Sequence, residues 1–408
     1  MKILMLTPYL PYPLLSGGQI RTYNLLKKLA TKYEVTLFAL IKEESERQYI
    51  PELEKYCAKV RVFKRSQRPF TLRNIFHTAF SSFPFLVIRN HVPQTIRAVE
   101  EELRAEHYDL IHAETFYMMP NIPRTEIPII LVEQTIEYLG YESYADKINF
   151  WPLRQILKLD IAKIRKWEEY YWRSCTKLIT MSQEDKDFID SIIHEPRKIE
   201  VVSNGVDVKW FAEKERKLPK NLTILSVGTF NWLPNVEAVK FLVENIWPIV
   251  KKKIPSVKLW IVGNAPTPEV FEYQKKDTSI TITGGIPDIR DAFCGAHVLV
   301  APVFSGKGTR YKILEAMAAG TPIVASELAV EGLGVDHGVQ VLIGNTAEEL
   351  AHLTIQLLKD PELQKKLAKN GKEFVQTRYD WDYIAQKLDH IYLNMASQAQ
   401  RDNSSLTS

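Results

Sequence analysis

A glycine-rich loop in the last third of the chain has the residue types that are needed to hold a diphosphate. It lies between a predicted strand at 297–301 and a predicted helix that begins at about Thr309. Gly306 and Gly308 free the backbone to present its N–H groups, and the helix directs its positive dipole end to the same place. The basic side chains of this segment are Lys307, Arg310 and Lys312. Such cationic donors suit a diphosphate.

A carboxylate follows within the same predicted helix. Glu315 lies one to two turns beyond the loop, where it can accept hydrogen bonds from a ribose diol, and Gly320 and Pro322 end the helix. The loop is not a Walker loop, because no Gly-Lys-Ser/Thr follows at the required spacing. A basic turn before an ordinary helix is the simpler alternative, but it would not require this ordered combination. We therefore interpret 306–322 as a nucleotide-binding segment.

A second glycine pair follows the first predicted strand, Lys2–Thr7. Ser16, Gly17 and Gly18 precede a helical pattern from about Gln19. Paired glycines allow a ligand to approach the backbone, and the helix N-terminus favours an anion. The spacing is not the G-x-G-x-x-G dinucleotide motif, so a simple turn is an equally good interpretation.

Short apolar runs alternate with helical patterns along the chain, which predicts two parallel sheets with crossover helices. The first series of strands is Lys2–Thr7, Glu34–Leu40, Lys59–Phe63, Asp109–Ala113, Pro128–Glu133 and Lys177–Met181. The second series is Leu222–Gly228, Val257–Val262, Ser279–Thr283, His297–Ala301, Pro322–Ala325 and Val339–Ile343. We predict an α/β chain with Rossmann-like domains at 1–205 and 206–381 and a helix at about 382–398 that returns to the first. The polar stretch Glu213–Asn221 predicts an interdomain linker.

The segment Gly308–Val324 resembles the nucleotide-sugar motif of the large family of retaining glycosyltransferases with the GT-B fold. This family includes sucrose synthases, phosphatidylinositol mannosyltransferases and bacterial cell-surface sugar transferases. Further landmarks in the same order are Gly17-Gly18, Asp109–Ala113, Val202–Asp207, Val227-Gly228, Val262-Gly263 and Thr283–Ile286. The resemblance covers nearly the whole chain. It implies two Rossmann-like domains that face each other across a cleft, the first for the acceptor and the second for the nucleotide sugar.

The resemblance also implies roles for individual residues. Glu315 would bind the donor ribose, and the backbone amides of Arg310 and Tyr311 would hold the distal phosphate. Ile286 would meet the nucleobase through its main chain, and Gly18 would approach the diphosphate from the first domain. The expected donor-binding positions are Gly17, Gly18, Gly228, Ile286, Lys307, Gly308, Thr309, Arg310, Tyr311 and Glu315.

The chain departs from the family pattern at three places. Lys307 replaces a glutamate that normally contacts the transferred sugar, and the usual basic pair after Gly228 is missing. We expect Arg310 and Lys312 to compensate, with Lys307, by stabilising the leaving diphosphate. Glu114 replaces a histidine of the catalytic region, where a carboxylate could still orient a hydroxyl.

Two further residues of the first predicted domain have alternative interpretations. Glu137 follows the strand Pro128–Glu133, and ligands bind at strand carboxyl ends, so we expect it to contact the acceptor. Surface solvation explains Glu137 equally well. His112 lies inside an apolar strand, which favours a structural histidine over a catalytic one.

The composition excludes several other classes of protein. The net charge of +4 does not indicate a nucleic-acid partner, and three widely spaced cysteines predict neither a disulfide framework nor a zinc site. The histidines show no metal-ligand spacing. We expect no metal and no cofactor, with the nucleoside-diphosphate sugar as co-substrate.

We expect a cytoplasmic protein, because the N-terminus lacks signal-peptide features and no window is apolar enough to span a bilayer. Leu153–Tyr171 is a basic amphipathic pattern that could touch an anionic membrane at its inner face. We favour a crossover helix that packs on the sheet, because acidic residues dilute its basic face.

The expected reaction is the transfer of a hexose-type sugar to a hydroxyl of a glycan or lipid-linked acceptor, with retention, in cell-surface glycan or glycolipid synthesis. Two alternatives remain open. One is a sugar-nucleotide epimerase, or a phosphorylase, of the same fold. The other is a catalytically silent partner that binds the sugar nucleotide.

Overall fold

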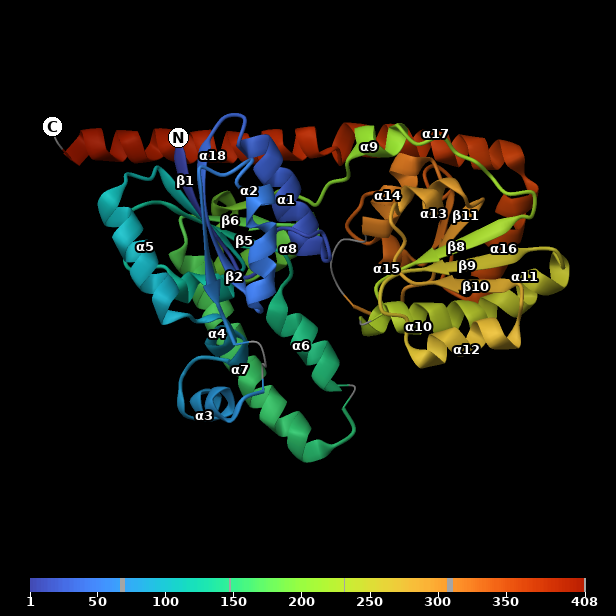
Figure 1. The fold of residues 1–408 in the computed structure, drawn as a ribbon, viewed down its shortest axis with the longest axis horizontal. Helices are drawn as coiled ribbons and strands as arrows, with labels where there is room; N and C mark the ends of the chain where they lie inside the picture. Colours follow the sequence, from blue (N-terminus) through green and yellow to red (C-terminus); the bar gives the residue numbers. More distant parts are fainter. Residues whose placement is uncertain (67–69, 147, 231, 307–310, 407–408) are drawn as a thin grey trace. The chain divides into compact units, whose positions relative to one another are not determined.

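The computed structural model describes residues 1–408 except 67–69, 147, 231, 307–310 and 407–408, and describes no side chains from 398 onward. The chain forms two compact units (Figure 1). The first comprises Met1–Ser203 and Ile384–Ser408, and the second comprises Asn204–Tyr383. Each unit is built around one parallel sheet.

The sheet of the first unit has seven strands in the order β3-β2-β1-β4-β5-β6-β7, and all its pairs are parallel. Its strands are β1 (Lys2–Thr7), β2 (Glu34–Ile41), β3 (Lys59–Lys64), β4 (Leu110–Glu114), β5 (Ile129–Glu133), β6 (Lys177–Thr180) and β7 (Ile199–Val201). Its helices are α1 (Gly17–Leu29), α2 (Ile50–Leu53), α3 (Leu72–Phe80), α4 (Phe85–Asn90), α5 (Pro93–Ala105), α6 (Glu137–Asp146), α7 (Trp151–Ser174) and α8 (Gln183–Ile193).

The sheet of the second unit has six strands in the order β10-β9-β8-β11-β12-β13, again all parallel. Its strands are β8 (Thr223–Val227), β9 (Lys258–Val262), β10 (Ile280–Thr283), β11 (Val298–Ala301), β12 (Ile323–Ala325) and β13 (Leu342–Ile343). Its helices are α9 (Val208–Ala212), α10 (Leu233–Phe241), α11 (Trp247–Lys253), α12 (Pro268–Lys276), α13 (Arg290–Cys294), α14 (Tyr311–Ala319), α15 (Glu327–Val330), α16 (Ala347–Lys359) and α17 (Pro361–Arg378).

The inner strands of each sheet are buried on both faces, which explains why they are mostly apolar, whereas the edge strand β3 is only partly buried and carries Lys59 and Arg61. In the second unit, Leu225 and Leu299 pack into a cluster with Ile313 of α14. Their neighbours Ile224 and Val298 belong to the cluster on the opposite face. Because side chains alternate along a strand, successive apolar residues supply the two cores.

The last helix, α18 (Trp381–Leu406), begins in the second unit and continues in the first. Within the first unit, Asp389 accepts a hydrogen bond from Lys32 Nζ at 2.7 Å and also contacts the Tyr33 hydroxyl. Tyr392 is fully buried and its hydroxyl lies 2.6 Å from His112 Nδ1. The end of the chain therefore belongs to the core of the first unit.

The structure contains all twelve predicted strands, but it corrects two details. β7 was not predicted, and the predicted strand Val339–Ile343 is reduced to β13 (Leu342–Ile343). The prediction of a linker at Glu213–Asn221 is wrong, because this stretch lies inside the second unit. Arg216 holds it there through Thr321 Oγ1 at 2.6 Å and the Ala296 carbonyl at 2.7 Å.

Helix α7 has two different halves. From the middle of the helix to its C-terminal end, Ile161, Ile164 and Trp172 are buried in the core that also contains Leu131 of β5. In its first half, Trp151 is 69% exposed and other apolar side chains are similarly open. The predicted stripe, Leu157, Ile161, Ile164 and Tyr171, packs on this core and is confirmed, whereas the exposed apolar residues at the start of the helix lie outside that stripe.

No helix among the described residues combines the length and the apolar character that are needed to cross a bilayer. All three cysteines are buried and free. Over the same residues, no group of three His, Cys, Asp or Glu side chains has the arrangement of a metal site.

Candidate functional site

Each sheet has a point at which its strand order reverses, and this is where ligands bind in open α/β sheets. In the first unit the reversal lies between β1 and β4, and in the second between β8 and β11. In the first unit, Gly17 and Gly18 begin α1 after β1, and Glu114 ends β4; in the second unit, Gly228 directly follows β8. The topology therefore places these predicted positions beside the two reversal points.

Gly228 and Lys312 are joined by a residue that was not predicted, Asn235. A side chain at Gly228 would put its Cβ 2.8 Å from Asn235 Cγ, so this position requires glycine. Asn235 Nδ2 donates to the Thr229 carbonyl at 2.9 Å, and Lys312 Nζ donates to Asn235 Oδ1 at 2.9 Å. Asn235 therefore fixes the loop after β8 against the first turn of α14.

Glu315 lies one turn further along α14 and is partly buried. Burial raises the pKa of its carboxyl to about 7, while the charge of Lys312 acts in the opposite direction. Within the described part of the chain, the carboxylate has no hydrogen-bond or ion-pair partner. It is therefore available to accept hydrogen bonds from a ligand.

Four predicted donor-binding positions, Lys307, Gly308, Thr309 and Arg310, lie outside the described residues. At the start of the same loop, the Ser305 hydroxyl donates to Glu237 of α10. Gly306 has a φ of 81°, which glycine adopts without strain. Tyr311 is the first residue of α14.

Ile286 follows β10 in a loop that begins with Gly284 and Gly285. A Cβ at Gly285 would lie 2.0 Å from Asn264 Oδ1, so the two loop segments approach closely. Ile286 itself is partly buried and packs on the core that lies under α14. The side chain thus anchors the loop, which leaves its main chain for the predicted contact with a base.

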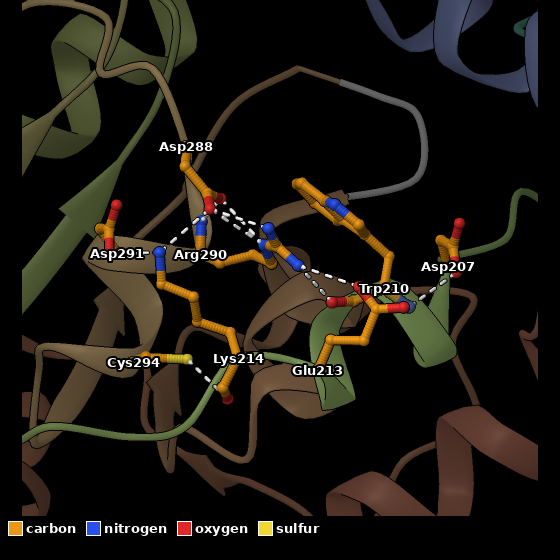
Figure 2. Close-up of polar contacts among 8 residues, drawn as sticks. All are labelled: Asp207, Trp210, Glu213, Lys214, Asp288, Arg290, Asp291 and Cys294. Carbon is orange, nitrogen blue, oxygen red and sulfur yellow. Dashed lines mark hydrogen bonds and ion pairs between the residues drawn. The ribbon is translucent and has the colours of Figure 1, made fainter.

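An ionic cluster holds the end of this loop (Figure 2). Arg290 donates to Asp288 through Nε at 3.0 Å and Nη2 at 2.9 Å, and its guanidinium lies 4.1 Å from the ring centroid of Trp210. Lys214 pairs with Asp288 at 3.1 Å and with Asp291 at 2.7 Å. The hydrogen bond from Arg290 is the main reason that the pKa of Asp288 falls to about 2. The cluster joins α9, α13 and the loop after β10.

In the first unit, Gly18 lies against two side chains that follow β1 and β5, the strands on either side of β4. A Cβ at Gly18 would lie 2.6 Å from Gln134 Oε1 and 2.6 Å from the Tyr9 hydroxyl. Gly17 is the first residue of α1, and Ser16 caps the helix by accepting from Gln19 N at 3.4 Å. Gln134 was not predicted, because a single glutamine after a strand carries no pattern.

Glu114 is the centre of a buried hydrogen-bond network. Its Oε2 accepts from Gln134 Nε2 at 2.6 Å, and its Oε1 lies 3.2 Å from His112 Nε2. Burial raises the pKa of Glu114, but the hydrogen bonds and charges of His112, Arg21 and Gln134 outweigh it and leave a pKa below the ordinary value. The side chain is 0% exposed. The Glu114 carboxylate is thus held by His112 and Gln134, and its role in orienting a hydroxyl stays a prediction.

Thr115, directly after Glu114, has a φ of 71°. A β-branched residue rarely adopts this conformation, because the backbone strain costs about 1–3 kcal/mol. Residues that are strained in this way are found most often at functional sites. The Thr115 amide donates to the Val132 carbonyl at 2.8 Å, which holds the turn in place. The sharp turn directs the chain away from the sheet immediately after the network.

Glu137 begins α6 and is partly buried. Burial raises its pKa to about 7, against an opposing effect of Arg89. The Glu137 amide donates to Glu168 Oε1 at 2.8 Å, so a carboxylate of α7 caps this helix. Burial, together with Glu168 and Glu137, also raises the pKa of Glu133 well above its ordinary value. Glu137 therefore belongs to a group of carboxyls that are costly to ionise, which does not fit simple surface solvation.

Comparisons with known proteins agree with the fold. Two family models match the chain, Glycosyltransferase Family 4 over residues 15–210 and Glycosyl transferases group 1 over residues 221–360. The "uncharacterized 44.6 kDa protein in cps region" of Klebsiella pneumoniae is 25% identical, over 93% of this chain and 96% of that protein. The UDP-Gal:alpha-D-GlcNAc-diphosphoundecaprenol alpha-1,3-galactosyltransferase of Escherichia coli is 26% identical, over 55% of this chain and 59% of its own length.

The solved structure of sucrose-phosphate synthase from Thermosynechococcus elongatus superposes with a TM-score of 0.69 at 18% identity and covers 98% of this chain and 100% of that one. This likeness concerns the fold alone. Together, the two family models span most of the chain, one on each unit. The protein therefore belongs to the group 1 glycosyltransferases and has the GT-B fold.

Proposed function

We propose that this protein transfers a sugar from a nucleoside diphosphate to an acceptor hydroxyl, with retention of anomeric configuration, in the synthesis of a cell-surface glycan or glycolipid. The observation that carries the proposal is the arrangement of Gly228, Asn235, Lys312 and Glu315 beside the reversal point of the second sheet. Retention is proposed from membership of the family.

In the proposed donor site, the carboxylate binds the ribose and the positive groups bind the diphosphate. Glu315 accepts hydrogen bonds from the ribose diol, which favours its ionised form over the neutral one. Lys312 and the start of α14 stabilise the negative charge that grows on the diphosphate as the bond to the anomeric carbon breaks. We propose no cofactor beyond the nucleotide sugar. Uridine is the first base to test, because the Escherichia coli relative is named for UDP-Gal.

We place the acceptor in the first unit. Gly18, Gln134 and Glu137 lie at the carboxyl edge of its sheet, where parallel strands deliver their loops. Glu137 has a pKa of about 7, so it can accept a proton from, or share one with, an acceptor hydroxyl near neutral pH. The named acceptor of the Escherichia coli relative is a sugar on a prenyl diphosphate, and we propose a lipid-linked acceptor of this kind.

We also propose peripheral contact with a membrane through α3 and the first half of α7. Both helices expose large apolar side chains, among them Leu72 at 87%, Phe76 at 62%, Trp151 at 69% and Ile156 at 64%. Lys163 Nζ of α7 donates to the Thr78 carbonyl at 2.6 Å, which holds the two helices together (Figure 1). An exposed apolar patch of this kind marks an interaction surface, and nearby basic residues suit an anionic bilayer.

The donor site is tested by ligand-induced stabilisation. We expect UDP or a UDP-sugar to raise the melting temperature of the wild-type chain, and Glu315→Ala to reduce that shift by lowering affinity about tenfold or more. Glu348→Ala is the matched control, because it removes an exposed carboxylate of α16 in the same unit. An equal shift in wild type and Glu315→Ala would contradict the assignment of the ribose contact.

A further inference from the structure

Three basic side chains gather at the carboxyl edge of the first sheet. Lys42 directly follows β2 and Arg65 directly follows β3, and the last paired residues of these strands are Ile41 and Lys64. The two cations therefore leave adjacent strands side by side. Arg89, near the end of α4, is the third member, and we call Lys42, Arg65 and Arg89 the cation cluster.

The three charges are close enough to repel one another. Burial lowers the pKa of Lys42, and the charges of Arg65 and Arg89 lower it further. Burial likewise lowers the pKa of Arg65 to about 10, again with a contribution from Arg89. Gathering like charges in this way costs free energy unless an anion binds among them.

No carboxylate within the described part of the chain forms an ion pair with any member of the cation cluster. Glu46 is the acidic neighbour of both Lys42 and Arg65, but its Oε1 accepts from the backbone amides of Lys42 and Glu43 at 2.7 and 2.8 Å. The Glu46 carboxylate therefore already caps backbone amides at the start of a helix. Glu137 is the acidic neighbour of Arg89, and its own pKa is raised to about 7 by burial.

Arg65 carries a donor that the fold leaves unsatisfied. The residue is 9% exposed, its Nη1 donates to Asn90 Oδ1 at 2.7 Å, and its Nε has no hydrogen-bond partner among the described residues. A buried donor without a partner costs about 1–3 kcal/mol. Such a group in a native fold calls for an explanation, and a ligand oxygen would supply its partner.

The surroundings of Arg65 are rigid. Asn90 is 1% exposed and donates to the Leu86 carbonyl at 2.8 Å, while its own carbonyl accepts from Asn121 Nδ2 at 3.0 Å. Asn121 Oδ1 accepts from the Val92 amide at 2.9 Å. The two asparagines thus fix the turn after α4, and through Asn90 they fix the guanidinium plane of Arg65. This is the preorganisation that a phosphate-binding site needs.

We propose that the cation cluster binds a phosphate or diphosphate ester of the acceptor. Guanidinium groups match phosphate oxygens in geometry as well as in charge, which favours a phosphate over a carboxylate or a neutral sugar. The site lies at the same sheet edge as Gly18, Gln134 and Glu137, where the acceptor hydroxyl is proposed to bind. This inference rests on the proposed function for the identity of the ligand, because the phosphate would belong to the acceptor. The ester is either lipid-linked or a soluble sugar phosphate.

The first test measures anion binding without catalysis. Inorganic pyrophosphate is titrated calorimetrically into the full chain saturated with UDP, which occupies the donor site. We expect Lys42→Gln and Arg89→Gln each to weaken pyrophosphate binding about tenfold, because each removes a charge-assisted hydrogen bond. Arg97→Gln, which removes an exposed charge from α5 of the same unit, should bind as the wild type does. Equal binding by wild type and the Lys42→Gln/Arg89→Gln double variant would overturn the proposal.

The second test identifies which of the two esters binds. It also shows whether the cation cluster has only a structural role. A prenyl diphosphate in detergent and a hexose 1-phosphate are each used to displace the bound pyrophosphate, and displacement by either supports the proposal and identifies the source. Failure of both esters would contradict it. The variants should keep the wild-type melting temperature and UDP affinity; a large loss of stability would instead indicate a structural cluster. If pyrophosphate binds as expected but no sugar transfer is found, then the proposed reaction fails while the anion site stands.

Discussion

At the scale of single residues, the site depends on groups that are costly to bury. Glu315 and Glu137 both have a pKa raised to about 7 by burial, so the fold carries carboxyls that weaken it when they ionise. Sequence patterns predicted both residues, along with Gly18 and Gly228. They could not predict Asn235, Gln134 or Arg65, because the role of an isolated polar residue depends on which residues surround it in the folded protein.

Glu315→Gln should therefore increase the stability of the free protein, although the carboxylate that it removes is proposed to bind the donor. The unfolded carboxyl ionises near pH 4, whereas the folded one ionises near 7, so the folded state loses stability as the pH rises through this interval. Removing the charge should raise stability at pH 8 by up to about 3 kcal/mol and leave it nearly unchanged at pH 4. Denaturant unfolding at both pH values measures this. A loss of stability at pH 8 would show that the carboxylate is satisfied in the free protein.

Gly18→Ala tests the close approach at the reversal point of the first sheet. The added Cβ would lie 2.6 Å from Gln134 Oε1 and from the Tyr9 hydroxyl, so the network around Glu114 must shift. We expect a destabilisation of about 1–3 kcal/mol. Gly140→Ala in α6 is the control, because its Cβ would meet nothing within 4 Å and a helix interior favours alanine. Equal stabilities of the two variants would refute the steric argument.

At the scale of elements, the parallel strands were predictable because the inner strands of each sheet are buried on both faces and are mostly runs of Ile, Leu and Val. β7 escaped prediction because Glu200 interrupts its three residues, Ile199–Val201, whereas β12, of the same length, is an uninterrupted apolar run. Helix α7 shows a different limit: the stripe that repeats at helical spacing packs on the core, but the pattern did not place the apolar residues outside it. The structure exposes two of these, Trp151 and Ile156.

The exposed apolar patch of α3 and α7 should bind anionic vesicles. We expect the chain to co-sediment with phosphatidylcholine vesicles that contain phosphatidylglycerol, and Phe76→Ser/Ile156→Ser to reduce the bound fraction several-fold by removing buried apolar area. Phe271→Ser, at a 40% exposed apolar position of α12, is the control and should bind as the wild type does. Vesicle binding that is unchanged in the double variant would exclude this patch as the contact.

At the scale of the whole molecule, the duplicated architecture follows from the alternation of strands and helices, and each sheet presents one reversal point with its own chemistry. The second unit offers a carboxylate and a cation suited to a nucleotide; the first offers a buried polar network, the carboxyl of Glu137 and the cation cluster. The sequence resemblance led to the family, and the two family models agree with it. What it could not provide was the set of side-chain contacts across elements, such as Asn235 to Lys312 or Asn90 to Arg65.

The central claim, sugar transfer from a nucleotide sugar, is tested most directly by product analysis. Purified wild-type chain, Glu315→Ala and Glu348→Ala are incubated with isotopically labelled UDP-hexoses and the lipid-linked sugar acceptor proposed above, and the products are separated by chromatography and mass spectrometry. The account predicts a labelled, glycosylated acceptor with wild type and Glu348→Ala, and at least a tenfold lower rate with Glu315→Ala. Donor that binds but is never transferred, or that is converted to a different sugar nucleotide, would contradict it.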